Sequence, residues 1–296
     1  MPRWMRCLWL PRSFRKILMP TSASDFAALQ KLTPAEAVAW LIARSKLTKS
    51  YAWQDVWQAE HSTQFTVSRL ARLDLLQALH EGITKSVAGD LSRADWMRDA
   101  EQLLADAGWW GVKAVTDPAT DKIVLTKFDP ARLKLIYDVN TRQAYATGLW
   151  ERVERSKKTL PYLRYITKRD ERVRASHAAW DNVTLPVDDP FWQTHWPPNG
   201  WRCRCRVNNL TKSDYDAGKT PTGDALKKEA PAVKLREYIN PRSGEVSQVP
   251  LGIDPGFAYN PGMARQQALQ DVINGKLAGA NPGLADAARR AGFKKD

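Results

Sequence analysis

The feature that most constrains the fold of this chain is the stretch Asp188 to Arg206, with the sequence DDPFWQTHWPPNGWRCRCR. Its adjacent prolines, Pro197 and Pro198, can neither continue a helix nor donate to a sheet ladder, and the Asn-Gly pair that follows readily adopts positive φ. The stretch is therefore predicted to form an irregular but fixed loop. The aromatic side chains available to clamp it are Phe191, Trp192, Trp196 and Trp201.

Two cysteines and two histidines lie in or near this loop. His177, His195, Cys203 and Cys205 would satisfy a tetrahedral zinc ion, and a turn can present both sulfurs of a Cys-x-Cys pair to one metal. The spacing departs from the common one, in which two to four residues separate paired cysteines. Two alternatives stay open: buried thiols hydrogen-bonded by histidines, or a nucleophilic Cys–His pair activated by neighbouring arginines. Zinc is the candidate cofactor.

The chain carries 45 Lys and Arg against 32 Asp and Glu, a formal net charge of +13. A balance this basic favours association with polyanions. Interleaved aromatic residues are typical of a surface that grips phosphates and stacks bases, although a solvated basic face without a dedicated ligand is an equal alternative. The residues of the candidate binding face are Arg164, Lys168, Arg169, Arg172, Arg174, Arg202, Arg204 and Arg206.

Several classes of protein are disfavoured. The sequence contains no Gly-rich phosphate loop, no Gly-x-Ser-x-Gly elbow and no His-Glu-x-x-His helix, so we predict a protein that is not an enzyme. No stretch approaches 18 consecutive apolar residues, so no transmembrane helix is expected. Three cysteines do not make a secreted disulfide framework, and a reducing compartment fits them better.

We predict an α+β protein in four parts. Residues 1–32 form a basic arm expected to be disordered, with Met19 as an alternative start. Residues 33–127 form a helical region, and residues 128–212 form a mixed α+β core that contains the loop. Residues 213–296 hold a linker, a hairpin and C-terminal helices.

Local patterns predict where helices begin. Thr33-Pro34-Ala35-Glu36 is a capping box with proline at the first helical position, and Ser92 to Asp95 is a similar pattern. Asp129-Pro130 opens a long helix in the same manner. Apolar residues at 3.6-residue spacing predict a helix across residues 51–82.

Other patterns predict strands. Residues 117–126 are typical of a turn with one short strand, and Tyr162 to Ile166 of a strand. Residues 233–239 and 245–249 flank a five-residue loop and predict a hairpin. Two short Ala-rich helices are expected to follow, up to Lys295.

The order and spacing of motifs over Asp129–Arg206 resemble the Mu F-like family of phage head morphogenesis proteins. The matching text is Asn140…Ala144-Tyr145…Gly148, Pro161-Tyr162-Leu163-Arg164-Tyr165, Arg172…His177, Asp189-Pro190-Phe191-Trp192…His195, Pro197-Pro198-Asn199-Gly200-Trp201 and Cys203-Arg204-Cys205, with Gly252 to Gly262 as a downstream element. The positions assigned a structural role are Asn140, Tyr145, Pro197, Pro198, Asn199, Gly200 and Trp201.

The resemblance implies a minor structural protein of a tailed-phage head that acts in prohead assembly at the portal or the capsid interior. Its implied partners are portal and capsid proteins and packaged double-stranded DNA, with no membrane partner. It would reside in the head interior of the virion, and in the host cytoplasm during assembly. Two rival classes remain: a nuclease-like nucleic-acid-processing enzyme, and a zinc-containing nucleic-acid-binding protein.

Overall fold

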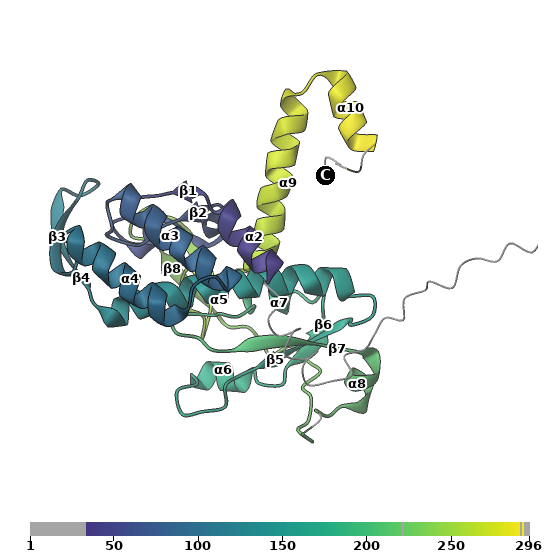
Figure 1. Ribbon diagram of the computed structural model, residues 1–296. Helices are drawn as coiled ribbons and strands as arrows, with labels where there is room; N and C mark the ends of the chain where they lie inside the picture. The colour runs from purple at the N-terminus through teal and green to yellow at the C-terminus, as the bar shows by residue number, and fades with distance from the viewer. Residues whose placement is uncertain (1–33, 221, 291, 293–296) are drawn as a thin grey trace, which may run out of the picture. The chain divides into compact units, whose positions relative to one another are not determined.

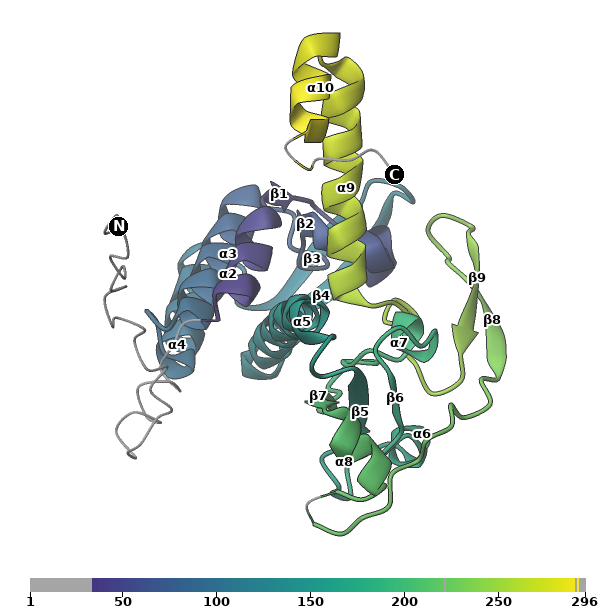
Figure 2. The ribbon, with the colours of Figure 1, turned by 90° about the vertical axis from the view of Figure 1, so that its right-hand side faces the viewer.

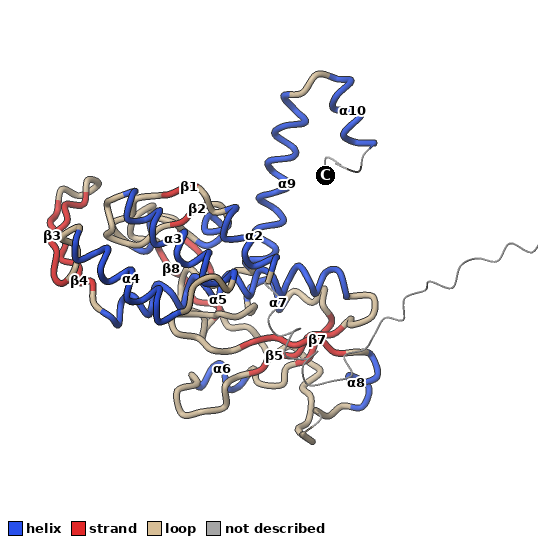
Figure 3. The backbone as a smooth tube through the Cα atoms, viewed as in Figure 1, coloured by secondary structure: helices blue, strands red, loops and turns tan. Residues whose placement is uncertain are grey.

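The computed structural model describes residues 34–220, 222–290 and 292 (Figure 1). The expected basic arm over residues 1–32, and Thr33 of the predicted capping box, lie outside the described residues. Helices and small β-sheets alternate along the described chain, which confirms the α+β class (Figure 3). Within this described part, every helix is too short or too polar to cross a membrane.

The helix α5, Pro130–Ser156, organises the fold. It begins as predicted: the Asp129 side chain accepts a hydrogen bond from the Arg132 backbone N–H at 2.9 Å, and Pro130 occupies the first turn. At about 1.5 Å per residue, its 27 residues extend for roughly 40 Å. This length allows one helix to contribute to two separate hydrophobic cores.

Three helices pack against α5 from the N-terminal side of the sequence: α2, Ala35–Ala43; α3, Leu73–Ala88; and α4, Arg93–Asp106. The Ser92 side chain caps α4 by accepting from the Asp95 N–H, as predicted. Together with α5 they enclose the first core. Its largest fully buried side chains are Trp40, Trp96, Phe65, Phe128, Leu41, Leu70, Leu75 and Leu76.

The helix predicted across residues 51–82 is wrong before Leu73. The chain instead forms two 3-10 turns, η1 Trp53–Asp55 and η2 Gln58–Ser62. A short parallel pairing flanks them, between β1 Lys46–Leu47 and β2 Gln64–Phe65.

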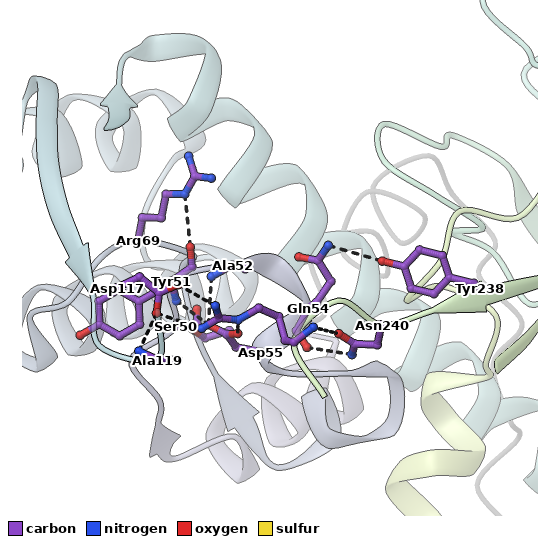
Figure 4. Close-up of polar contacts among 12 residues, drawn as sticks. Ser50, Tyr51, Ala52, Gln54, Asp55, Arg69, Asp117, Ala119, Tyr238 and Asn240 are labelled. Carbon is purple, nitrogen blue, oxygen red and sulfur yellow. Dashed lines mark hydrogen bonds and ion pairs between the residues drawn. The ribbon is translucent and has the colours of Figure 1, made fainter. Parts of the chain in front are cut away.

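Local carboxylates explain this difference. Asp55 accepts the backbone N–H groups of Tyr51 and Ala52 at 2.6 and 2.9 Å (Figure 4), and Glu60 accepts that of Trp57 at 2.5 Å. Such bonds offer the backbone an alternative to the helical ladder. The apolar residues of this segment are therefore spaced like those of a helix, but they are buried within tight turns.

Residues 111–128 form an antiparallel hairpin, β3 Gly111–Asp117 and β4 Lys122–Phe128, where the sequence predicted a turn and one short strand. Burial alternates along the second half of each strand, as expected for a half-buried pair. The Asp117 carboxylate accepts two hydrogen bonds from Arg242, at 2.6 and 3.1 Å. This contact ties the hairpin to a segment far along the chain.

A three-stranded antiparallel sheet follows α5, in the order β6-β5-β7. The predicted strand Tyr162–Ile166 is confirmed as the central strand β5, between β6 Thr184–Pro186 and β7 Arg206–Leu210. Figure 2 looks along α5 and shows α2, α3 and α4 on one side of it and this sheet on the other. The second core lies between the sheet and α5. Its buried aromatic residues are Trp150, Tyr165, Trp180, Phe191, Trp192, Trp196 and Phe257.

The short helices α6, Ala175–Ala179, and α7, Phe191–Thr194, lie in the connections of this sheet. After β7 comes α8, Lys212–Ala217, which overlaps the start of the stretch expected to be a linker. Thr211 caps α8 by accepting from the Asp214 N–H at 3.1 Å.

The predicted hairpin is confirmed as β8 Leu235–Ile239 and β9 Val246–Pro250. It is held to the η1 region by Asn240, whose side-chain amide donates to the Gln54 carbonyl at 3.3 Å (Figure 4). The two predicted C-terminal helices are also present, as α9 Pro261–Gly279 and α10 Pro282–Arg290.

The packing of α9 on α5 generates a test. A Cβ built on Gly262 would overlap the Trp150 side chain, whereas one on Gly275 of the same helix meets nothing within 4 Å. Gly262→Ala is therefore expected to lower the free energy of unfolding by ~1–3 kcal/mol through overpacking. Gly275→Ala should raise it by ~0.5–1 kcal/mol, since alanine is the better helix former. Denaturant titration measures both, and equal effects would contradict this contact.

Candidate functional site

The loop from Asp188 to Arg206 is irregular, as predicted, and its central residues 195–200 are buried. Phe191, Trp192 and Trp196 are all buried, and the Pro197–Pro198 peptide bond is cis. The fully buried Asn199 side chain holds the turn from inside: its Oδ1 accepts from the Tyr165 hydroxyl at 2.8 Å. Its amide donates to two carbonyls of the same loop, at 3.3 and 3.4 Å. A buried side-chain amide must find such partners, and here they define the loop.

A second polar centre fixes the outer part of the loop. The Asp254 carboxylate accepts from both Nη atoms of Arg174, at 3.0 and 2.9 Å, and from the Trp201 backbone N–H at 2.8 Å. The Asp254 N–H in turn donates to the Asn199 carbonyl at 3.1 Å. A Cβ on Gly200 would overlap the side chains of Arg174 and Asp254, so only glycine fits beneath this ion pair.

Trp201 does not act as the buried clamp that the sequence predicted. Its side chain is 36% exposed and makes edge contacts with Trp53 and Phe257, with ring centroids 6.1 and 5.0 Å apart. The Trp201 backbone N–H donates to the Asp254 carboxylate, and this contact leaves the Trp201 ring at the surface.

The structure brings together three of the four predicted metal ligands. His177 Nδ1 lies 3.7 Å from Cys203 Sγ and 3.6 Å from Cys205 Sγ. The three ligand atoms all lie within 4.8 Å of one another, and both thiols are free. His177 lies on α6, and the two cysteines lie directly before β7. We call these residues the Cys–His cluster.

His195, the fourth predicted ligand, is not part of this cluster. Its buried ring stacks on Phe191 with centroids 4.2 Å apart, and its Nδ1 lies 2.9 Å from the Thr194 hydroxyl. Burial lowers the pKa of His195 to about 4, so its ring is neutral at physiological pH. Its role in this fold is packing.

The thiols of the Cys–His cluster differ in acidity. A hydrogen bond from the Cys205 thiol lowers the pKa of the Cys203 thiol. The same hydrogen bond, together with burial, raises the pKa of Cys205. The pair therefore favours a single negative charge over two. Burial also raises the pKa of the neighbouring Tyr165 hydroxyl well above its usual value, so it stays protonated.

A pocket of about 550 Å³ adjoins the Cys–His cluster and is lined by all three of its residues. Basic residues dominate the rest of its wall, with Asp138 as the acidic exception. We call this the basic pocket. Its basic residues are Lys134, Arg142, Lys168, Arg172, Arg174, Arg202 and Arg204.

Five of the eight residues predicted for the basic face therefore line one pocket. Arg164, Arg169 and Arg206 do not. The sequence reasoning missed Lys134 and Arg142, which α5 contributes. The available signal was their spacing with Asp138 at four-residue intervals, which places all three on one side of a helix.

Many of the predicted basic residues are occupied by internal partners. Arg174 binds Asp254; Arg204 binds Asp170 with two hydrogen bonds of 2.6 Å. Arg169 bridges Asp181 and Asp224, each at 2.8 Å. These arginines support the fold and are poor candidates for a ligand surface.

The remaining basic residues differ in exposure. Arg164 is half-buried, with two guanidinium nitrogens that have no described partner. Arg172 forms a salt bridge with its neighbour Glu171, and both side chains are largely exposed. Of the basic residues in the basic pocket, Lys134, Lys168 and Arg202 are exposed and form no salt bridge with a described acid, and the same holds for Arg206 of the predicted face.

Two further positions were assigned a structural role. Asn140 is buried in α5, and its Oδ1 accepts from Arg44 Nη1 at 2.9 Å while its amide donates to the Ile136 carbonyl at 2.8 Å. It thus joins α5 to the residue that ends α2. Tyr145, in contrast, is 47% exposed on the surface of α5.

A second pocket, of about 690 Å³, lies between the η1–η2 region, α5 and the segment that follows β9. Buried Arg44 reaches it and is held by Asn140 and the Gln64 carbonyl. Burial lowers the pKa of Arg44 to about 10, and burial also lowers the pKa of His61, to about 3. Sequence reasoning did not anticipate this pocket, since its lining comes from five separate stretches of the sequence: 40–69, 132–143, 201, 241–242 and 256–259.

Comparison with known proteins places this arrangement in a family. The family profile described as Phage Mu protein F like protein matches residues 72–208. The chain is 33% identical over 258 residues to the putative capsid assembly protein F of Escherichia phage Mu, an alignment covering 83% of this chain and 58% of that protein. It is 30% identical over 163 residues to the Mu-like prophage FluMu F protein of Haemophilus influenzae, covering 55% and 38% respectively.

The chain belongs to the Mu F-like family. It spans 58% and 38% of the lengths of these two relatives. No solved structure gives a significant match to it.

The Asp254 contacts predict a stability effect. Asp254→Asn removes the charge that faces Arg174 while keeping the side-chain shape, and is expected to lower the free energy of unfolding by ~1–3 kcal/mol. Glu171→Gln is the matched control, because the Arg172–Glu171 pair has exposed fractions of 77% and 80%. It should change stability by no more than ~0.5 kcal/mol. Thermal or denaturant unfolding that finds the two variants alike would refute the role given to Asp254.

Proposed function

We propose that this chain is a structural protein of a tailed-phage head that acts in prohead assembly, at the portal or on the capsid interior. The observation that carries the proposal is its similarity, over 83% of its length, to a putative capsid assembly protein of phage Mu. Since the chain spans 58% of that relative, its partners are part of the proposal. They are portal and capsid proteins, and the chain is assigned no catalytic reaction and no membrane partner.

We further propose that the basic pocket contacts the phosphates of packaged double-stranded DNA. Lys134, Lys168 and Arg202 supply exposed positive charge there, without a salt bridge to any described acid. The half-exposed ring of Trp201 lines the same pocket and could contact sugar or base. Arginine and lysine contacts of this kind give affinity without sequence preference.

The DNA contact predicts a salt dependence. Binding of duplex DNA to the full chain can be measured by fluorescence anisotropy. For each tenfold increase in salt concentration, log K should fall by ~0.9 per phosphate neutralised. Replacing Lys134, Lys168 and Arg202 with glutamine should lower affinity at every salt concentration. It should also reduce the slope by ~1 for each phosphate contact removed.

A matched control separates a local contact from net charge. Lys46, Lys49 and Lys122 are exposed and do not line the basic pocket, so their replacement by glutamine removes the same charge elsewhere. Equal loss of affinity in the two triple variants would refute the pocket as the contact. If the wild-type chain binds no duplex but binds an acidic portal or capsid protein, the partner of the pocket is a protein.

The assembly role has its own test. Mass spectrometry of purified proheads and virions should detect the chain in both. Phage that lack it should accumulate defective heads, and supplying the chain in trans should restore them. Normal, infectious, DNA-filled heads made without the chain would refute the assembly role, whatever the result with DNA.

A further inference from the structure

The Cys–His cluster has the dimensions of a metal site. A tetrahedral zinc ion binds thiolate sulfur at about 2.3 Å and imidazole nitrogen at about 2.0–2.1 Å, which places a sulfur and a nitrogen about 3.5–3.6 Å apart. His177 Nδ1 lies 3.7 and 3.6 Å from the two sulfurs. Both sulfur–nitrogen separations therefore match those around one shared ion, and all three atoms lie within 4.8 Å of one another.

The His177 ring is oriented for this role. Its Nε2 lies 2.9 Å from the Gly252 carbonyl oxygen, to which only a protonated Nε2 can donate. This bond leaves the lone pair of Nδ1 directed at the sulfurs. A hydrogen bond from the second ring nitrogen to a carbonyl is the usual way in which proteins orient a metal-binding histidine.

The Gly252 carbonyl is itself held in place. Gly252 has φ +97°, a left-handed conformation that favours glycine. A Cβ at this position would lie 2.6 Å from the Ser176 Cβ and 3.1 Å from the Trp180 ring. Ser176 and Trp180, which flank His177 in the sequence, therefore pack directly on Gly252, whose carbonyl orients the His177 ring.

The cysteine backbone is equally constrained. The Cys203 N–H donates to the Gly200 carbonyl at 3.1 Å, and the Cys203 carbonyl accepts from Arg142 Nη1 at 2.6 Å. Residues 203–205 lie outside the regular strand, which begins at Arg206. This irregular backbone lets cysteines separated by one residue place both sulfurs beside the same histidine nitrogen.

The cluster supplies three ligands, one fewer than a tetrahedral zinc ion takes. Among the described His, Cys, Asp and Glu residues, only these three form a group of this kind. All three line the pocket, together with seven lysine and arginine residues. A water molecule or a small anion could complete the tetrahedron from that side.

We propose that His177 Nδ1, Cys203 Sγ and Cys205 Sγ bind one zinc ion, with the fourth position open to the basic pocket. Two thiolates and an imidazole are a ligand set that zinc favours, and they disfavour magnesium and calcium. The ion would join α6 to the end of the Trp- and Pro-rich loop. This inference is independent of the proposed role in head assembly and goes beyond it.

Metal analysis of the full chain tests the site. Protein expressed with zinc in the medium and purified without chelator is expected to contain one zinc ion per molecule. Cys203→Ser and Cys205→Ser should each lose most of it. Two controls should keep it: Cys7→Ser, which removes the remaining cysteine of the chain, and His195→Gln, which removes the buried histidine of the same loop.

Zinc that persists in both cysteine variants, or that is lost equally in the Cys7→Ser control, would overturn the proposal. So would a Cys203–Cys205 disulfide detected by mass spectrometry in protein handled without oxidant.

Cobalt titration of metal-free wild type avoids any variant that fails to fold. Co²⁺ should produce intense thiolate-to-metal charge-transfer absorption that saturates at one ion per chain, and its absence would overturn the site. Inorganic phosphate added to the cobalt-loaded protein should shift the visible ligand-field bands, because the fourth position is open. Bands that stay unchanged would overturn the open position.

Discussion

The whole arrangement depends on the burial of α5 from two sides. Leu133 and Ala144 face the core shared with α2, α3 and α4, while Trp150 and Val153 face the core beneath the three-stranded sheet. Both cores depend on this helix, because α5 contributes buried side chains to each of them. A helix buried on both sides also fixes where its remaining, partly exposed stripe lies. That stripe, through Lys134, Asp138 and Arg142, forms one wall of the basic pocket.

The charge of the chain is less available than its composition suggests. Arg169, Arg174 and Arg204 are each bound by one or two carboxylates of the fold, which offset their charge within the formal +13. These arginines act mainly as cross-links between distant segments. Only residues such as Lys168 and Arg202, whose side chains lack such a partner among the described acids, present charge to a ligand.

Sequence reasoning succeeded where the chemistry is local. The caps at Ser92 and Asp129, the strand at Tyr162–Ile166 and the β8–β9 hairpin depend on neighbouring residues, and all are confirmed. It failed over residues 51–72, because carboxylates of that segment bind backbone N–H groups that a helix would need.

The candidate site shows the same division. Proximity in sequence suggested that His177, Cys203 and Cys205 could meet, and the structure places them together. It could not show that His195 turns away into an aromatic stack. Nor could it show that Gly252 orients the His177 ring, since that contact joins residues 75 positions apart.

The late position of Asp254 has a consequence for synthesis on the ribosome. Arg174 is made 80 residues before the carboxylate that binds it, an interval of about 4–16 s at ~5–20 residues per second. The Trp192 carbonyl is likewise made 68 residues before Asn260, whose side-chain amide donates to it at 3.2 Å. Only the last 48 residues of that interval, from Arg206 to Asp254 (254 − 206), follow synthesis of the whole loop, and over them the loop and its two thiols lack the groups that hold them. The nascent chain therefore passes through a stage in which this aromatic segment is complete but still lacks two of its fixing contacts.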